Sequence, residues 1–112
     1  MKEQSVKLVV PTDIEILEAM SDGKRQTAPN LAEILGRKSR YMNNRLAELA
    51  GNGLVSKVGP SDSSGMYEIT EKGRKALEMR HEYSHNQAEK FGRKLVQELD
   101  SSDLESDKGD EE

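Results

Sequence analysis

The sequence predicts a mainly α fold of the α+β class: a three-helix core, a two-stranded hairpin and a C-terminal helix. Three observations predict it. Apolar residues recur at helical spacing in three successive segments that end near residue 51. Two short stretches rich in β-branched residues then flank a Gly-, Pro- and Ser-containing loop at 59–65. A last helical pattern runs from residue 71 to residue 99.

Length and composition bound the class of protein. A chain of 112 residues has the length of one domain with one modest core. The absence of cysteine excludes disulfides and thiolate metal sites. We find no signal-peptide pattern and no apolar run long enough for a membrane span, so we expect a soluble, cytoplasmic protein without a membrane partner.

The net charge of −4 is unevenly distributed. Residues 100–112 hold seven acidic residues and one lysine, a charge of −6, which leaves +2 on residues 1–99. Residues 24–59 carry +5, and residues 1–23 carry −3. Because salt confines the field of a surface charge to about 8–10 Å, the local value decides which partner the surface attracts.

The first helix is predicted to begin at Thr12, whose side chain would form a capping box with Glu15. Its buried stripe is expected to be Ile14, Leu17 and Met20, and residues 21–23 end it.

The second helix is predicted from a Thr27 cap with Pro29 in the first turn, where a missing N–H costs nothing. Gly36 stops it. One apolar side is formed by Leu31, Ile34 and Leu35.

The third helix is predicted from an Ser39 cap to a Gly51 stop. Its apolar stripe falls at i, i+4, i+7 and i+8, on Met42, Leu46, Leu49 and Ala50. The opposite face and its flanks carry guanidinium and carboxamide groups, on Arg40, Asn43, Asn44 and Arg45. Arg bonds guanine edges and Asn bonds adenine edges. A merely solvated helix face is the alternative interpretation.

A short helix joined through a glycine-bearing turn to a longer, polar-faced helix is the helix-turn-helix pattern. The residues that follow predict strands at 54–58 and 66–70, a hairpin in the position of a wing. Thr70 then caps a last helix.

The last helix carries Ala88, Phe91, Leu95 and Leu99 at spacings of three and four. We divide the chain into a winged helix-turn-helix domain at 11–78, a C-terminal helix at 79–99 and an acidic tail at 100–112 that is expected to be disordered. The C-terminal helix is expected to pair with its copy in a second chain, giving a homodimer. The alternative is that it folds back on its own domain.

Four stretches carry a family resemblance: residues 11–17, residues 31–36, residues 45–49 with Gly53-Leu54-Val55, and residues 67–73. The chain resembles winged helix-turn-helix regulators and is similar to the small archaeal phage-repressor-like group found in haloarchaea. The resemblance implies binding to double-stranded DNA, with the third helix in the major groove.

Carried over by position, the resemblance implies that Arg40, Asn43 and Asn44 face bases. Phosphates would be held by Thr27, Lys38, Ser39, Tyr41, Arg45 and Lys57. Arg37 belongs to the same predicted DNA-binding surface. The wing tip at 61–64 departs from the pattern, because it has no Arg or Lys and contains Asp62, which would repel phosphate.

Residues 81–85 match the letters of H-E-x-x-H, in which two His one helical turn apart bind zinc. Glu89 could be a third ligand, but a chain this small offers little room for a cleft. We expect solvated histidines here, with no metal, no cofactor and no enzymatic activity.

Together these observations predict a sequence-specific, double-stranded DNA-binding transcriptional regulator, a homodimeric repressor that occludes a promoter. The alternative function is a winged-helix module that binds protein and not DNA, because fold alone does not decide function.

Overall fold

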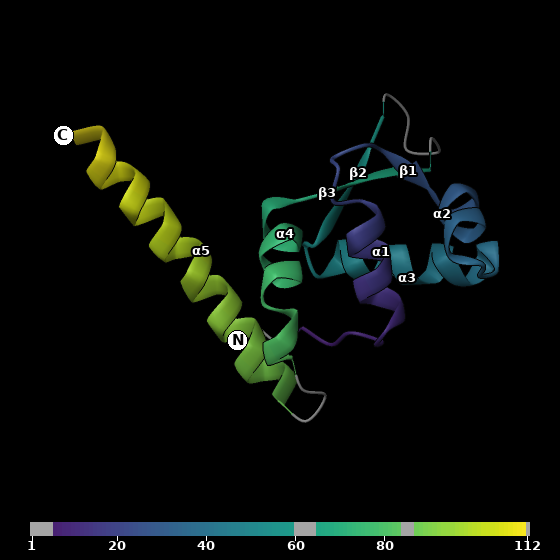
Figure 1. Ribbon diagram of the computed structural model, residues 1–112, viewed down its shortest axis with the longest axis horizontal. Helices are drawn as coiled ribbons and strands as arrows, with labels where there is room; N and C mark the ends of the chain where they lie inside the picture. Colours follow the sequence, from purple (N-terminus) through teal and green to yellow (C-terminus); the bar gives the residue numbers. More distant parts are fainter. Residues whose placement is uncertain (1–5, 60–64, 84–86, 112) are drawn as a thin grey trace.

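The computed structural model describes residues 6–59, 65–83 and 87–111, with residues 100–111 described by their backbone alone. Its elements in chain order are α1 (Thr12–Ala19), β1 (Gln26–Thr27), α2 (Ala28–Leu35), α3 (Ser39–Gly51), β2 (Val55–Val58), β3 (Met66–Ile69), α4 (Glu71–Glu78), the 3₁₀ turn η1 (Arg80–Glu82) and α5 (Ala88–Glu111). Helices α1 to α3 and the sheet form one body, and α5 runs along its far side beyond α4 (Figure 1). The predicted α+β class is confirmed.

The core is formed where the helices of the body meet. Its fully buried members from the helices include Ile16, Leu17, Leu31, Met42, Leu46 and Leu49, all 0% exposed. The predicted inner stripe of α3 is therefore confirmed for Met42, Leu46 and Leu49. On α1 the prediction for Ile14 is wrong, because Ile14 is only partly buried and Ile16 takes its place.

The sheet has three strands, and the predicted two-stranded hairpin is incomplete. The strand order is β1-β3-β2, all antiparallel. Gln26 pairs with Tyr67 across one edge of β3, and Lys57 pairs with the same tyrosine across the other. A strand of two residues shows no periodicity, so no sequence pattern could reveal β1.

Two of the predicted helix caps are confirmed. The Thr27 hydroxyl accepts from the Asn30 amide at 3.2 Å, and the Thr70 hydroxyl accepts from the Gly73 amide at 3.0 Å. The left-handed Gly36, with φ 67°, ends α2 as expected.

The other caps differ from the prediction. Thr12 lies inside α1 and makes no cap; Asp13 instead accepts from the Val9 amide at 2.8 Å. Lys38, not Ser39, is the N-cap of α3, and no side chain caps that end.

Gly51 is not the stop that the sequence predicts, because it is the last helical residue of α3. Gly53, with φ 79°, is the left-handed residue that stops the helix. The Gly53 amide donates to the Ala50 carbonyl at 3.0 Å and the Leu54 amide to that of Leu49 at 2.9 Å, which is a Schellman motif. The chain turns at Gly53 in a way that buries Leu54 completely, and this burial favours the later stop.

The C-terminal region is not one helix from Glu71. It breaks after α4, and the extended Tyr83 follows η1 before α5 begins at Ala88. The Tyr83 ring packs edge-on against Phe91, with centroids 5.3 Å apart. A tertiary contact therefore overrides the continuous helical pattern.

The first half of α5 folds back on its own domain. Ala88, Phe91 and Leu95 are 5%, 3% and 0% exposed within the single chain. The helix then continues to Glu111, where composition predicts disorder. Residues 99–111 contain no proline, so a helix already nucleated at Ala88 can propagate through them. No helix among the described residues has both the length and the apolar character to cross a membrane.

Candidate nucleic-acid interface

The outer face of α3 is a polar surface of the described chain that is not used for packing. Arg40, Asn43, Asn44 and Ala47 lie at i, i+3, i+4 and i+7, and all four are exposed. They lie opposite the buried stripe that fixes α3 in the core. Within the parts of the chain that the structure describes, the Arg40, Asn43 and Asn44 side chains make no hydrogen bond or ion pair. Their donors and acceptors are available to a partner.

The N-terminal end of α3 is electropositive. Lys38, Ser39 and Tyr41 are exposed beside Arg40, and the first turn carries no acidic residue. The unsatisfied amides of a helix N-terminus add a partial positive charge of roughly half an elementary charge. This end of the helix therefore favours an anion such as a phosphate.

Arg45, for which the resemblance implies a phosphate contact, is paired with a carboxylate of the same chain. Its Nε donates to Asp13 Oδ1 at 2.9 Å and its Nη2 to Asp13 Oδ2 at 2.8 Å. The Asp13 side chain is 0% exposed and that of Arg45 is 15% exposed. The hydrogen bonds with Asp13 raise the pKa of Arg45 in spite of its burial. This bidentate pair uses Nε and Nη2 of Arg45 and fastens α3 to α1.

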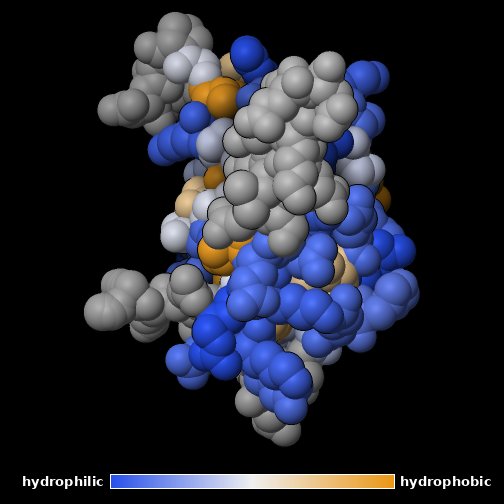
Figure 2. All heavy atoms as spheres, turned by 90° about the vertical axis from the view of Figure 1, so that its left-hand side faces the viewer, coloured by the Kyte–Doolittle hydropathy of each residue, from blue (hydrophilic) through white to orange (hydrophobic). Residues whose placement is uncertain are grey.

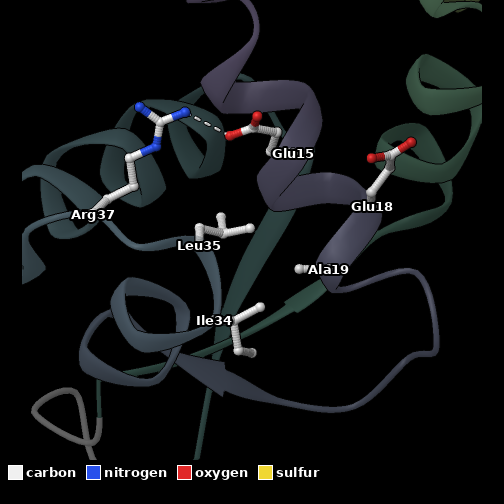
Figure 3. A pocket seen from close by; sticks show the side chains of 6 residues that line it. All are labelled: Glu15, Glu18, Ala19, Ile34, Leu35 and Arg37. Atoms are coloured by element: carbon white, nitrogen blue, oxygen red, sulfur yellow. Dashed lines mark hydrogen bonds and ion pairs between the residues drawn. The ribbon is translucent and has the colours of Figure 1, made fainter.

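Arg37 is also engaged within the chain. Its Nη2 donates to Glu15 Oε1 at 2.7 Å, so the turn between α2 and α3 is tied to α1. Arg37 and Glu15 lie at one end of an open groove of about 450 Å³ between α1 and α2 (Figure 3). The groove is also lined by Glu18, Ala19, Ile34 and Leu35. Ile34, on the apolar side predicted for α2, is 54% exposed, whereas Leu31 on the same side is fully buried.

Thr27 and Lys57 lie on the two outer strands of the sheet, β1 and β2. The Thr27 hydroxyl accepts from Asn30, which leaves its own proton for another acceptor. Lys57 is exposed. The wing tip with Asp62 lies outside the described residues.

The H-E-x-x-H pattern does not lie on one helix. His81 and Glu82 are in η1, Tyr83 is extended, and His85 lies outside the described residues. Glu82 pairs with Lys94 of α5. In the part of the chain that the structure describes, no three His, Cys, Asp or Glu residues gather where they could hold a metal ion.

The residue that sequence reasoning missed is Asp13. It stands in the first helix and its partner Arg45 in the third, and no local spacing links the two. The only sequence signal was an acidic residue beside the apolar Ile14, where burial demands a cation or several donors.

No protein-family model matches the chain, and no curated protein sequence matches it. A solved structure does match: the complex structure of hsRosR-S1, with a TM-score of 0.54 at 19% sequence identity. The similarity covers 88% of this chain and 94% of that one. It shows a shared fold, and with the helix order and sheet described above that fold is a winged helix-turn-helix.

Proposed function

We propose that this chain is a sequence-specific, double-stranded DNA-binding transcriptional regulator, which acts by binding alone and represses as a homodimer that occludes a promoter. The observation that carries the proposal is the outer face of α3, where Arg40, Asn43 and Asn44 are exposed and make no bonds to the rest of the described chain. The shared fold with RosR, a haloarchaeal winged-helix transcription regulator, supports the same class of function.

In this proposal α3 enters the major groove with its N-terminal end leading, as recognition helices do. The Arg40 guanidinium bonds guanine O6 and N7, and the Asn43 and Asn44 amides bond adenine N6 and N7. Phosphates are held around this face by Thr27, Lys38, Ser39, Tyr41 and Lys57. Arg45 and Arg37 support the helix from behind, through Asp13 and Glu15.

The homodimer is proposed from the part of α5 that follows Leu95 and leads away from the body (Figure 1). Val96 and Leu99 are half-buried there, after the last fully buried residue, Leu95. Figure 2 views this side and shows small hydrophobic patches in a largely hydrophilic surface. The helix is basic at residues 90–94 and acidic at 98–111, so two copies placed antiparallel would bring opposite charges together.

The dimer is tested by Leu99→Asp. A carboxylate in an apolar helix pair is expected to convert the dimer to monomer at micromolar concentration, with the far-ultraviolet circular dichroism unchanged. Sedimentation velocity measures the mass. Gln97→Asp, an exposed change on the same helix that adds the same charge of −1, is the matched control. An equal mass for wild type and Leu99→Asp would contradict pairing through this face.

The DNA-binding proposal is tested by measuring the affinity of the protein for DNA from its own upstream region and for a shuffled duplex, over a range of salt. Tighter binding to the upstream DNA, with log K falling linearly in log salt, is the expected result, and the slope counts the phosphate contacts. Equal affinity for both duplexes would contradict sequence-specific binding. No binding to either duplex at low salt would contradict DNA binding altogether.

A protein partner is the second candidate, and one observation favours it. Ile34 is 54% exposed in the groove between α1 and α2, which Glu15 and Glu18 also line. Protein interfaces commonly place an apolar anchor within a polar rim. A failure of all DNA binding would direct the next experiments to this groove.

A further inference from the structure

A short N-terminal arm, residues 6–9, joins the start of α5 to the start of α1. The Val6 amide donates to the Ala88 carbonyl at 3.2 Å. The Leu8 amide donates to the Tyr83 hydroxyl at 2.9 Å, and that hydroxyl donates back to the Leu8 carbonyl at 3.3 Å. Val6 and Leu8 are 2% and 1% exposed, so the arm is part of the core and not a loose end.

The arm is locked to α1 by a reciprocal pair of bonds. The Asp13 amide donates to the Val9 carbonyl at 2.8 Å, and the Val9 amide donates to Asp13 Oδ2 at 2.8 Å. The position of the Asp13 carboxylate is therefore set by the arm as well as by α1.

The same carboxylate oxygen holds the DNA-facing helix. Asp13 Oδ2 accepts from both the Val9 amide and Arg45 Nη2, each at 2.8 Å. Because the Asp13 side chain is 0% exposed, no solvent can replace a bond that is lost or lengthened. A shift of the arm must change the geometry of the Arg45 pair, and Arg45 is adjacent to Asn44 on α3.

We propose that Asp13 is the positioning residue of the DNA-facing helix, and that the arm couples its position to the start of α5 through Tyr83. This inference rests on the proposed function for its effect on DNA. Movement of α5, as on pairing with a second copy, then changes how Arg40 and Asn44 meet the base edges. Phosphate contacts, which tolerate small shifts, are affected less.

The test is Tyr83→Phe, a residue that lies outside the proposed DNA-binding set. The change removes both bonds to Leu8 and leaves the ring that packs on Phe91. The matched control is Glu82→Gln, which breaks the neighbouring surface pair with Lys94 and does not touch the arm. The probes are a duplex that the wild-type protein has enriched from a random pool, and a scrambled duplex of the same composition.

Tyr83→Phe is expected to weaken binding to the enriched duplex about three- to tenfold and to leave the scrambled duplex within error, the size of effect found for residues that act through a contact network. Glu82→Gln is expected to change neither affinity. An equal loss on both duplexes, or no loss on either, overturns the coupling.

Amide hydrogen exchange separates this inference from the proposed function, because it needs no DNA. In Tyr83→Phe the amides of residues 42–46 are expected to exchange faster relative to those of α2, whereas a general loss of stability raises both together. Faster exchange in α3, if the wild-type protein binds no DNA, would support the coupling and contradict the proposed function. Exchange that rises equally in α2 and α3 would remove the coupling whatever the protein binds.

Discussion

At the scale of single residues, Gly73 is a position where the neighbouring atoms leave no room for a side chain. It is the third residue of α4, where glycine costs about 1 kcal/mol relative to alanine. A Cβ there would lie 2.1 Å from the Leu54 carbonyl oxygen and 2.9 Å from Ile69 Cγ1. The missing side chain lets α4 start against the Leu54 carbonyl, which accepts from the Thr70 amide at 3.1 Å.

Gly73→Ala is therefore expected to destabilise the fold by about 1–3 kcal/mol, because backbone cannot yield as a flexible side chain can. Gly51→Ala is its matched control. Gly51 is also helical, and a Cβ there meets nothing within 4 Å, so this change should stabilise the fold by up to about 1 kcal/mol. Urea unfolding measures both. Changes of the same sign in the two variants would contradict the packing argument.

At the scale of elements, α3 shows what could and could not be predicted. Its inner stripe of Met42, Leu46 and Leu49 follows from helical spacing alone, and so does the exposure of Arg40 and Asn44. Arg45 could not be assigned, because its carboxylate partner lies on another helix and periodicity does not tell a buried ion pair from a phosphate contact.

The other elements divide in the same way. Helix caps that use a local hydroxyl, as at Thr27 and Thr70, were predictable, because donor and acceptor lie within three residues of each other. The strand β1 and the break before α5 depend on pairing with Tyr67 and on the contact between Tyr83 and Leu8. Both contacts join residues far apart in sequence, and no local pattern contains them.

The face of α3 is tested by Arg40→Ala and Asn44→Ala, each expected to cost about 1–3 kcal/mol on the cognate duplex and to relax specificity at one base pair. Affinities for a set of singly substituted duplexes measure the effect. Lys90→Ala, an exposed cation on α5, is the control and should leave the preferences unchanged. A uniform loss across all sequences would assign Arg40 or Asn44 to a phosphate.

At the scale of the whole molecule, charge is separated along the chain. Residues 24–59, which contain α3, carry +5, and residues 100–112 carry −6. The acidic end of α5 extends away from the body (Figure 1). A polyanion that approaches the protein is therefore attracted by residues 24–59 and repelled by the acidic end of α5.

Truncation after Leu99 is expected to strengthen binding to scrambled DNA, because it removes −6 of charge, and the gain should shrink as salt is raised. Affinity at low and at physiological salt measures it. A full-length variant with the acidic residues of 100–112 changed to Asn and Gln separates charge from helix length. An unchanged affinity in both variants would show that this end does not influence DNA binding.

The pairing of Gln26 with Tyr67 also constrains the order in which the chain can assemble. Both α2 and α3 lie between these two residues, so the edge formed by β1 closes only after the segment containing both helices has become compact. Non-local strand pairing of this kind slows folding. The three-stranded sheet should therefore be completed late, on a framework of helices already in place, and a nascent chain that ends before Met66 would expose that framework without its sheet.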